Sequence, residues 1–112
     1  MSGHAITTLT GATFEQMVLQ GEGPIAVEFM SYSCAYCAAL EPVLQQAAGM
    51  LAAQERIFRI NIGNDEDLAE SFGITGTPTI VLFQNGSEVG RVDGPEPDLN
   101  AILAELTQPF AA

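Results

Sequence analysis

The sequence contains no lysine and no tryptophan, and its basic residues are three arginines and one histidine. Fourteen acidic residues give the chain a formal net charge of −11. Without a basic stripe, the chain is not expected to bind DNA or RNA, because their phosphates demand several cationic contacts. An anionic membrane surface should repel it for the same reason. We therefore expect neither a nucleic acid nor a membrane among its partners.

Long apolar runs are also absent, because no stretch reaches the ~18 residues that a membrane-spanning helix needs. Residues 1–13 lack the cationic start and the apolar run of a signal peptide. From these absences we expect a cytoplasmic protein. The length of 112 residues suits a single domain over residues 1–112, with residues 1–4 as a disordered tail.

Histidine and cysteine are too scarce for an ordinary metal centre. The only histidine is His4, and the only cysteines are Cys34 and Cys37. A structural zinc site takes four ligands and a catalytic one takes three, so we expect no metal site within one chain. The two cysteines instead form one C-x-x-C motif, and its neighbours must decide what it means.

Apolar runs and helical spacing predict strands alternating with helices. The expected strands cover residues 5–9, 25–30, 56–62, 79–84 and 87–93. The expected helices cover residues 13–20, residues 34 or 35 to 53, a segment from an Asn64 cap to Phe72, and residues 97–107. The order β-α-β-α-β-α-β-β-α predicts an α/β fold with a central mixed β-sheet flanked by helices.

Several side chains have the chemistry of helix ends and turns. Thr13, with Gln16 three residues later, has the spacing of a capping box. Asn64 is a suitable N-cap, and Gly73 is expected to end the third helix in a left-handed conformation. Asn85-Gly86 predicts a two-residue hairpin turn before the last strand.

The C-x-x-C motif falls where a buried strand ends and a long helix begins. A helix N-terminus carries partial positive charge and unpaired N–H groups, which stabilise a thiolate. Cys34 is therefore the expected attacking sulfur, and Cys37, in the first helical turn, is expected to resolve the mixed disulfide. Glu28 is an acid inside an apolar strand, where burial should raise its pKa toward neutrality.

Several separate segments together resemble the thioredoxin family. They are Val27–Cys37 with its C-x-x-C motif, Pro42, Phe72–Thr79, Phe83–Gly86 and Gly94. The resemblance covers about residues 6–107 and implies a thioredoxin fold. It also implies a thiol–disulfide oxidoreductase that acts on protein disulfides and is recycled by a partner reductase or oxidant. Such chemistry needs no bound cofactor, because the two sulfurs carry the electrons, and we expect a monomer.

The resemblance implies roles for residues outside the cysteine pair. Pro78 falls on the family's cis-proline, and Thr77 would offer its backbone to an extended substrate peptide. Glu28 falls on the family's buried acid and would relay a proton to or from Cys37. The expected substrate site consists of Tyr36, Thr77, Pro78 and Gly94.

The chain departs from the family's pattern around the cysteines. Where the family has C-G-P-C, this chain has Ala35 and Tyr36 between Cys34 and Cys37. Ser33, just before the motif, occupies a position where tryptophan is usual. Ala38 replaces a frequent basic residue, and Asp93 stands where an apolar residue often lines the substrate groove. Because Tyr36 replaces a rigid proline, we expect a reductant weaker than a typical thioredoxin.

Three alternatives use the same fold or cysteine pair differently. The first alternative is a glutaredoxin-like protein, because a tyrosine at the position of Tyr36 is typical of dithiol glutaredoxins. Glutathione carboxylates need basic side chains to bind them, however, and the three arginines of this chain supply few. A chaperone or assembly factor would use the fold for binding, with redox activity secondary. Two chains could also share a [2Fe–2S] cluster through thiolates, because no proline ring crowds the motif.

Overall fold

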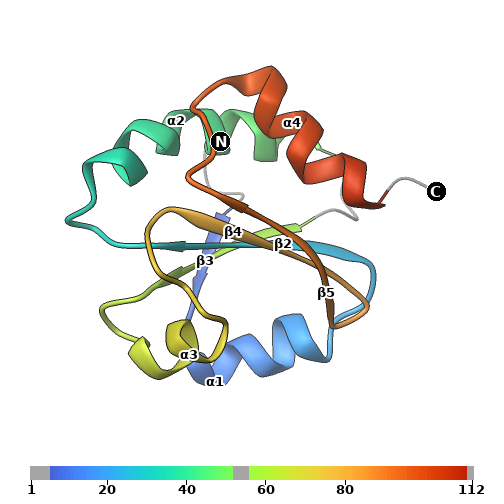
Figure 1. Ribbon diagram of the computed structural model, residues 1–112. Helices are drawn as coiled ribbons and strands as arrows, with labels where there is room; N and C mark the ends of the chain where they lie inside the picture. The colour runs from blue at the N-terminus through green and yellow to red at the C-terminus, as the bar shows by residue number, and fades with distance from the viewer. Residues whose placement is uncertain (1–5, 52–55, 111–112) are drawn as a thin grey trace.

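A five-stranded mixed sheet lies between two layers of helices (Figure 1). The computed structural model describes residues 6–51 and 56–110. The elements are β1 (Ile6–Leu9), α1 (Gly11–Phe14), η1 (Glu15–Leu19), β2 (Pro24–Met30), α2 (Ala35–Met50), β3 (Arg56–Asn61), α3 (Glu66–Ser71), β4 (Thr79–Gln84), β5 (Ser87–Asp93), α4 (Leu99–Thr107) and η2 (Gln108–Phe110). This arrangement confirms the predicted order of strands and helices.

The central strand of the sheet is β2. The strand order is β1-β3-β2-β4-β5, with β3 parallel to both β1 and β2. β4 runs antiparallel to both β2 and β5. Because α2 and α4 lie on one face of the sheet and α1 and α3 on the other, β2 is covered on both sides (Figure 1). Such double coverage explains why this strand is almost continuously apolar.

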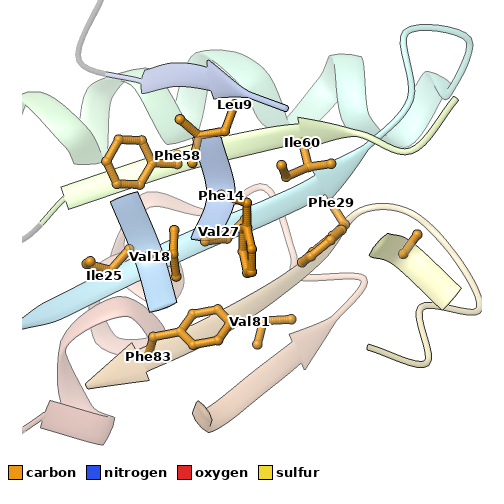
Figure 2. Packing of buried hydrophobic residues seen from close by; sticks show 11 residues of the cluster. Leu9, Phe14, Val18, Ile25, Val27, Phe29, Phe58, Ile60, Val81 and Phe83 are labelled. Carbon is orange, nitrogen blue, oxygen red and sulfur yellow. The ribbon is translucent and has the colours of Figure 1, made fainter. Parts of the chain in front are cut away.

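Each face of the sheet has its own hydrophobic core. Alternate residues of β2 point to opposite faces, so Val27 joins one cluster of buried side chains and Ala26 joins the other. In the cluster between the sheet and the helices α1 and α3, Phe14 packs edge-to-face on Phe72 and Phe83, with ring centroids 5.5 and 5.8 Å away. Figure 2 shows Phe14 among the side chains of this cluster. The segment that follows β2, which leads to Cys34 and α2, is thus attached to a strand that is packed on both faces.

The first helix begins at Gly11, earlier than the predicted residue 13. Its N-cap is Thr10, whose hydroxyl accepts the Thr13 N–H at 3.4 Å, while the Thr13 hydroxyl accepts the Thr10 N–H at 2.8 Å. Thr13 is therefore the third helical residue of a capping box and not its N-cap. The prediction was wrong because both threonines have suitable side chains, and the end of β1 at Leu9 places Thr10 at the helix start.

The third helix begins after Asp65, one residue later than a cap at Asn64 would allow. Asp65 precedes α3 but makes no capping hydrogen bond. Its Oδ1 instead accepts the backbone N–H of Gly11 at 2.8 Å, which joins the start of α3 to the start of α1. A contact between residues so distant in sequence leaves no local signal, so the predicted cap was wrong.

Predicted turns are confirmed at the glycines that need positive φ. Gly73 ends α3 with a φ of 66°, where a side chain would be strained. Asn85 and Gly86 have φ values of 53° and 84° between β4 and β5. Positive φ at both positions is typical of the hairpin turns whose twist matches that of the flanking strands.

The two long helices differ slightly from their predicted bounds. α2 ends at Met50, because Leu51 already has an extended backbone, whereas the prediction continued to residue 53. α4 begins at Leu99, and Asp98 caps it by accepting the N–H of Ala101 at 3.0 Å. The expected tail over residues 1–4 lies outside the described residues.

Candidate active site

The cysteine pair lies at the junction between β2 and α2. Cys34 is the N-cap of α2, and its sulfur accepts the backbone N–H of Cys37 at 3.1 Å. The Cys34 thiol donates to the carbonyl of Thr77 at 3.6 Å. The N-terminus of α2 presents free N–H groups and the positive end of the helix dipole to this sulfur. The Cys37 N–H and the helix N-terminus favour a thiolate at Cys34.

The two cysteines differ in burial and acidity. Cys34 is half-buried and Cys37 is only 3% exposed, and both are free thiols. Burial, reinforced by the neighbouring Cys34 sulfur, raises the pKa of Cys37 to about 11. Burial also acts on Cys34, but hydrogen bonds from Cys37 and from the backbone of Tyr36 outweigh it and hold the pKa of Cys34 below its ordinary value. As the pH rises, the thiolate therefore forms first at Cys34.

A cis-proline lies next to the cysteine pair. The Thr77–Pro78 peptide bond is cis, and the Thr77 carbonyl is the one that faces Cys34. The Pro78 carbonyl accepts the N–H of Gly94 at 2.9 Å. The Gly94 carbonyl in turn accepts the hydroxyl of Tyr36 at 3.4 Å. Hydrogen bonds thus bring together all four residues that were predicted to form the substrate site.

Asp93 places a carboxylate at the border of this group. Its side chain is exposed, and its Oδ1 accepts the hydroxyl of Thr79, the residue after Pro78, at 3.2 Å. Asp93, which stands where the family often has an apolar residue of the substrate groove, therefore lies beside the cis-proline.

Glu28 is the buried acid of the site. Only 1% of this residue is exposed, and the parallel register of β2 and β3 places it beside Arg59. The Arg59 Nε lies 3.4 Å from Oε1, while Oε2 has no hydrogen-bond partner among residues 6–51 and 56–110. Burial raises the pKa of Glu28 to about 7, against the opposing charge of Arg59. Near neutral pH this carboxyl group can therefore accept a proton or release one.

Arg59 and Glu41 were missed as site residues in the sequence. The Arg59 Nη2 makes a close ion pair with Glu41 of α2. Both side chains line a pocket of about 310 Å³, which Cys34 and Cys37 also line. Glu41 follows Cys37 at the i,i+4 spacing of a helix, so periodicity could have placed it on the same face. The place of Arg59 depends on the register between β2 and β3, for which the sequence holds no local signal.

The buried carboxyl group should make stability depend on pH. An acid whose pKa rises on folding keeps its proton longer in the folded chain, so its contribution is fully present below the unfolded pKa and is lost as the pH rises through the folded pKa. For Glu28 the shift from 4.5 to about 7 corresponds to about 3 kcal/mol. Glu28→Gln should therefore lose less stability than the parent between pH 4.5 and 8, as measured by urea unfolding.

An exposed glutamate provides the control for this measurement. Glu70 lies on α3, on the opposite face of the sheet from α2 (Figure 1). Glu70→Gln removes the same charge and should keep the pH dependence of the parent. An equal loss of stability in Glu28→Gln and the parent over this pH range would contradict the prediction.

Two further properties concern residues 6–51 and 56–110. No helix among them has the length and apolar character to cross a membrane. They also contain no group of three or more histidine, cysteine or acidic side chains arranged to hold a metal ion.

Known proteins resemble the chain along almost all of its length. The Thioredoxin family model matches residues 5–108. A thioredoxin of Alicyclobacillus acidocaldarius is 34% identical over 106 residues, which cover 93% of this chain and 100% of that protein. A thioredoxin of Pseudomonas aeruginosa is 34% identical over 87 residues, which cover 78% of this chain and 80% of that one. The solved structure of a mutant thioredoxin from Halobacterium salinarum has a TM-score of 0.84 at 25% identity, covering 100% of this chain and 96% of that one. Since fold, C-x-x-C motif and sequence agree over this length, the chain belongs to the thioredoxin family of thiol–disulfide oxidoreductases.

Proposed function

We propose that Cys34 and Cys37 reduce disulfide bonds of protein substrates, with Cys34 as the attacking sulfur. The observation that carries this proposal is the contrast between the two sulfurs. Cys34 is half-buried at the start of α2 and has a lowered pKa, whereas Cys37 is buried and has a pKa of about 11. A thiolate nucleophile and a protected second thiol are what two-step exchange requires.

The reaction proceeds through a mixed disulfide. The Cys34 thiolate attacks one sulfur of the substrate disulfide, and the other substrate sulfur leaves as a thiolate that takes a proton from water. Cys37 then loses its proton and attacks the Cys34 sulfur. The Cys34–Cys37 disulfide forms, and the second substrate sulfur leaves and is protonated. The two sulfurs of the chain give up two electrons, and the substrate gains them together with two protons, one from water and one that balances the proton lost by Cys37.

Glu28 accepts the proton of Cys37 in the second step. A thiol with a pKa of about 11 needs a base at neutral pH. A carboxyl group with a pKa of about 7 is partly ionised there and can serve as that base. Cys37 and Arg59, the partner of Glu28, line the same pocket, and in this scheme water in that pocket carries the proton between Cys37 and Glu28.

The substrate peptide binds along Tyr36, Thr77, Pro78 and Gly94. The Thr77 backbone lies next to the reacting sulfur, so an extended peptide that pairs with it brings its disulfide to Cys34. Tyr36 is 44% exposed, and its hydroxyl is held by the Gly94 carbonyl. Its ring is thus available for contact with the substrate.

The cysteine pair should be a weaker reductant than that of a typical thioredoxin. We expect a potential between about −200 and −260 mV, compared with about −270 mV for thioredoxin. Glutaredoxins, which often carry tyrosine at this position, have potentials of about −200 to −230 mV. The lowered pKa of Cys34 acts in the same direction, since it stabilises the reduced form. Equilibration with reduced and oxidised glutathione, followed by alkylation and mass spectrometry, measures the potential.

Two variants of Tyr36 separate the ring from its hydroxyl group. Tyr36→Pro restores the family's residue and should move the potential toward about −270 mV. Tyr36→Phe keeps the ring, loses the bond to Gly94 and should stay close to the parent. A parent potential below about −280 mV would contradict the weaker reductant, and one above about −150 mV would indicate an oxidant.

Protein disulfides fit the site better than glutathione does. Glutathione carboxylates need cationic anchors, and the chain has three arginines and no lysine. All three arginines already have partners: Arg56 donates to the Glu22 carbonyl, Arg59 pairs with Glu28 and Glu41, and Arg91 pairs with Glu88. A glutathione carboxylate would have to share a guanidinium group that already has a partner in the protein.

A reductase that restores the dithiol and a cytoplasmic location complete the proposal. A pair at the expected potential stays largely reduced where glutathione and thioredoxin systems keep thiols reduced. Within this scheme the chain acts as a monomer without a bound cofactor, because the electrons reside on Cys34 and Cys37.

A further inference from the structure

Arg59 lies between two carboxylates of different burial. From β3 it reaches Oε1 of Glu28 through Nε at 3.4 Å, and it forms a second ion pair with Glu41 through Nη2. The Glu28 side chain is 1% exposed, whereas that of Glu41 is 35% exposed. The guanidinium group thus bridges a buried acid and a more exposed one.

A second donor fixes the Glu41 carboxylate. Gln45, one turn later in α2, donates from Nε2 to Oε2 of Glu41 at 2.8 Å. Burial raises the pKa of Glu41, but the hydrogen bonds from Arg59 and Gln45 outweigh it and leave this pKa below its ordinary value. Glu41 therefore stays ionised while Glu28 titrates. Both oxygens of Glu41 have donors, whereas Oε2 of Glu28 has none in the part of the chain that the structure describes.

We infer that Glu41 is a positioning residue for the redox reaction: by engaging Arg59 and keeping a negative charge near the buried acid, it leaves Glu28 basic enough to accept the Cys37 proton. This inference rests on the proposed role of Glu28. Without the charge of Glu41, the Arg59 guanidinium would pair with Glu28 alone. A carboxylate that is fully paired with a cation holds a proton less well.

Few other charged groups act on Glu28. Within the described residues, the side chains presented to this face of the sheet include Arg59 of β3, Glu41 and Cys37 of α2, Ile80 of β4, and Ile102 and Leu106 of α4. α4 also carries Glu105, whose pKa is raised by its burial and by Glu96. The charges that shift the pKa of Glu28 are those of Arg59 and Glu41.

Glu41→Gln tests the inference because it removes the charge and keeps the shape. The measured quantity is the single-turnover rate at which Cys37 resolves a preformed mixed disulfide, followed between pH 5 and 9. The midpoint of this pH profile should move to lower pH by about 1 unit, and the plateau at high pH should fall because the base is weaker. Glu70→Gln, which removes an exposed acid on the opposite face of the sheet, should leave the midpoint unchanged.

Two further variants and a direct titration separate the inference from the proposed function. In a Glu28→Gln background, Glu41→Gln should no longer move the midpoint. Arg59→Gln should move it to higher pH, because it removes the cation that stabilises the Glu28 carboxylate. A carbon-13 NMR titration of the Glu28 carboxyl group should show the same shifts without relying on kinetics.

The outcomes that overturn the inference are distinct. If Glu28→Gln alters the pH profile but Glu41→Gln keeps both the kinetic midpoint and the NMR titration of the parent, Glu41 has no positioning role and the role of Glu28 stands. If Glu28→Gln leaves the profile unchanged, the role of Glu28 fails, and the inference about Glu41 fails with it.

Discussion

Cys34→Ser should abolish disulfide reduction, whereas Cys37→Ser should stop the reaction one step later with the substrate covalently trapped. The Cys34 sulfur is half-buried at the N-terminus of α2 and receives the N–H of Cys37, so the attacking thiolate forms there. A serine hydroxyl cannot replace it as a nucleophile toward sulfur. Without Cys37, no second thiol lies within reach of the mixed disulfide, and the intermediate persists.

Insulin reduction with dithiothreitol measures the first variant, and mass spectrometry under denaturing, non-reducing conditions detects the trapped intermediate in the second. The double variant with both serines should show neither activity nor trapping.

Faster alkylation of Cys37 than of Cys34 near neutral pH would reverse the assigned roles. An inactive parent would favour the chaperone alternative, and a brown colour after anaerobic purification would favour a bridging iron–sulfur cluster.

Glu28→Gln should slow resolution by Cys37 about 100-fold or more while leaving the attack by Cys34 nearly unchanged. The amide keeps the shape of the side chain inside the core but cannot take a proton. Since the pKa of Cys37 is about 11, its thiol would then have to lose the proton directly to solvent. Single-turnover kinetics between pH 6 and 9 measure the two steps separately.

Glu28→Asp is the matched variant for this prediction. It keeps the carboxyl group on a shorter side chain and should resolve the mixed disulfide faster than Glu28→Gln does. If Glu28→Gln were slow only because it disturbs packing, the shorter side chain of Glu28→Asp would not recover any of the rate. Identical pH profiles for the parent and Glu28→Gln would remove Glu28 from the mechanism.

Several features of this protein could be read from local sequence. The strand before the cysteines is nearly all apolar because it is covered on both faces. The C-x-x-C motif is confirmed at a helix start, because strand and helix periodicities meet there. Asn85-Gly86 and Gly73 have the positive φ values that their residue types favour. In each case the interaction that decides the structure involves residues within a few positions of one another.

Other features depended on which distant segments meet. Thr10 and Thr13 are both suitable caps, and the Asp65 side chain turns to Gly11 instead of capping α3. The end of β1 at Leu9 selects Thr10 as the cap of α1, and the contact with Gly11 removes the Asp65 side chain from the cap of α3. The predicted caps at Thr13 and Asn64 were wrong for these two reasons.

The charges around the active site show the same division most clearly. Sequence alone determined that Glu28 lies in a buried strand and that its carboxyl group needs compensation. Only the tertiary structure decided that Arg59 is its partner, because the parallel register of β2 and β3 pairs these two residues. Only the packing of α2 on the sheet decided that Glu41 shares the same guanidinium group. Electrostatic interaction depends on distance in space, and strand register and helix packing set that distance between segments far apart in the sequence.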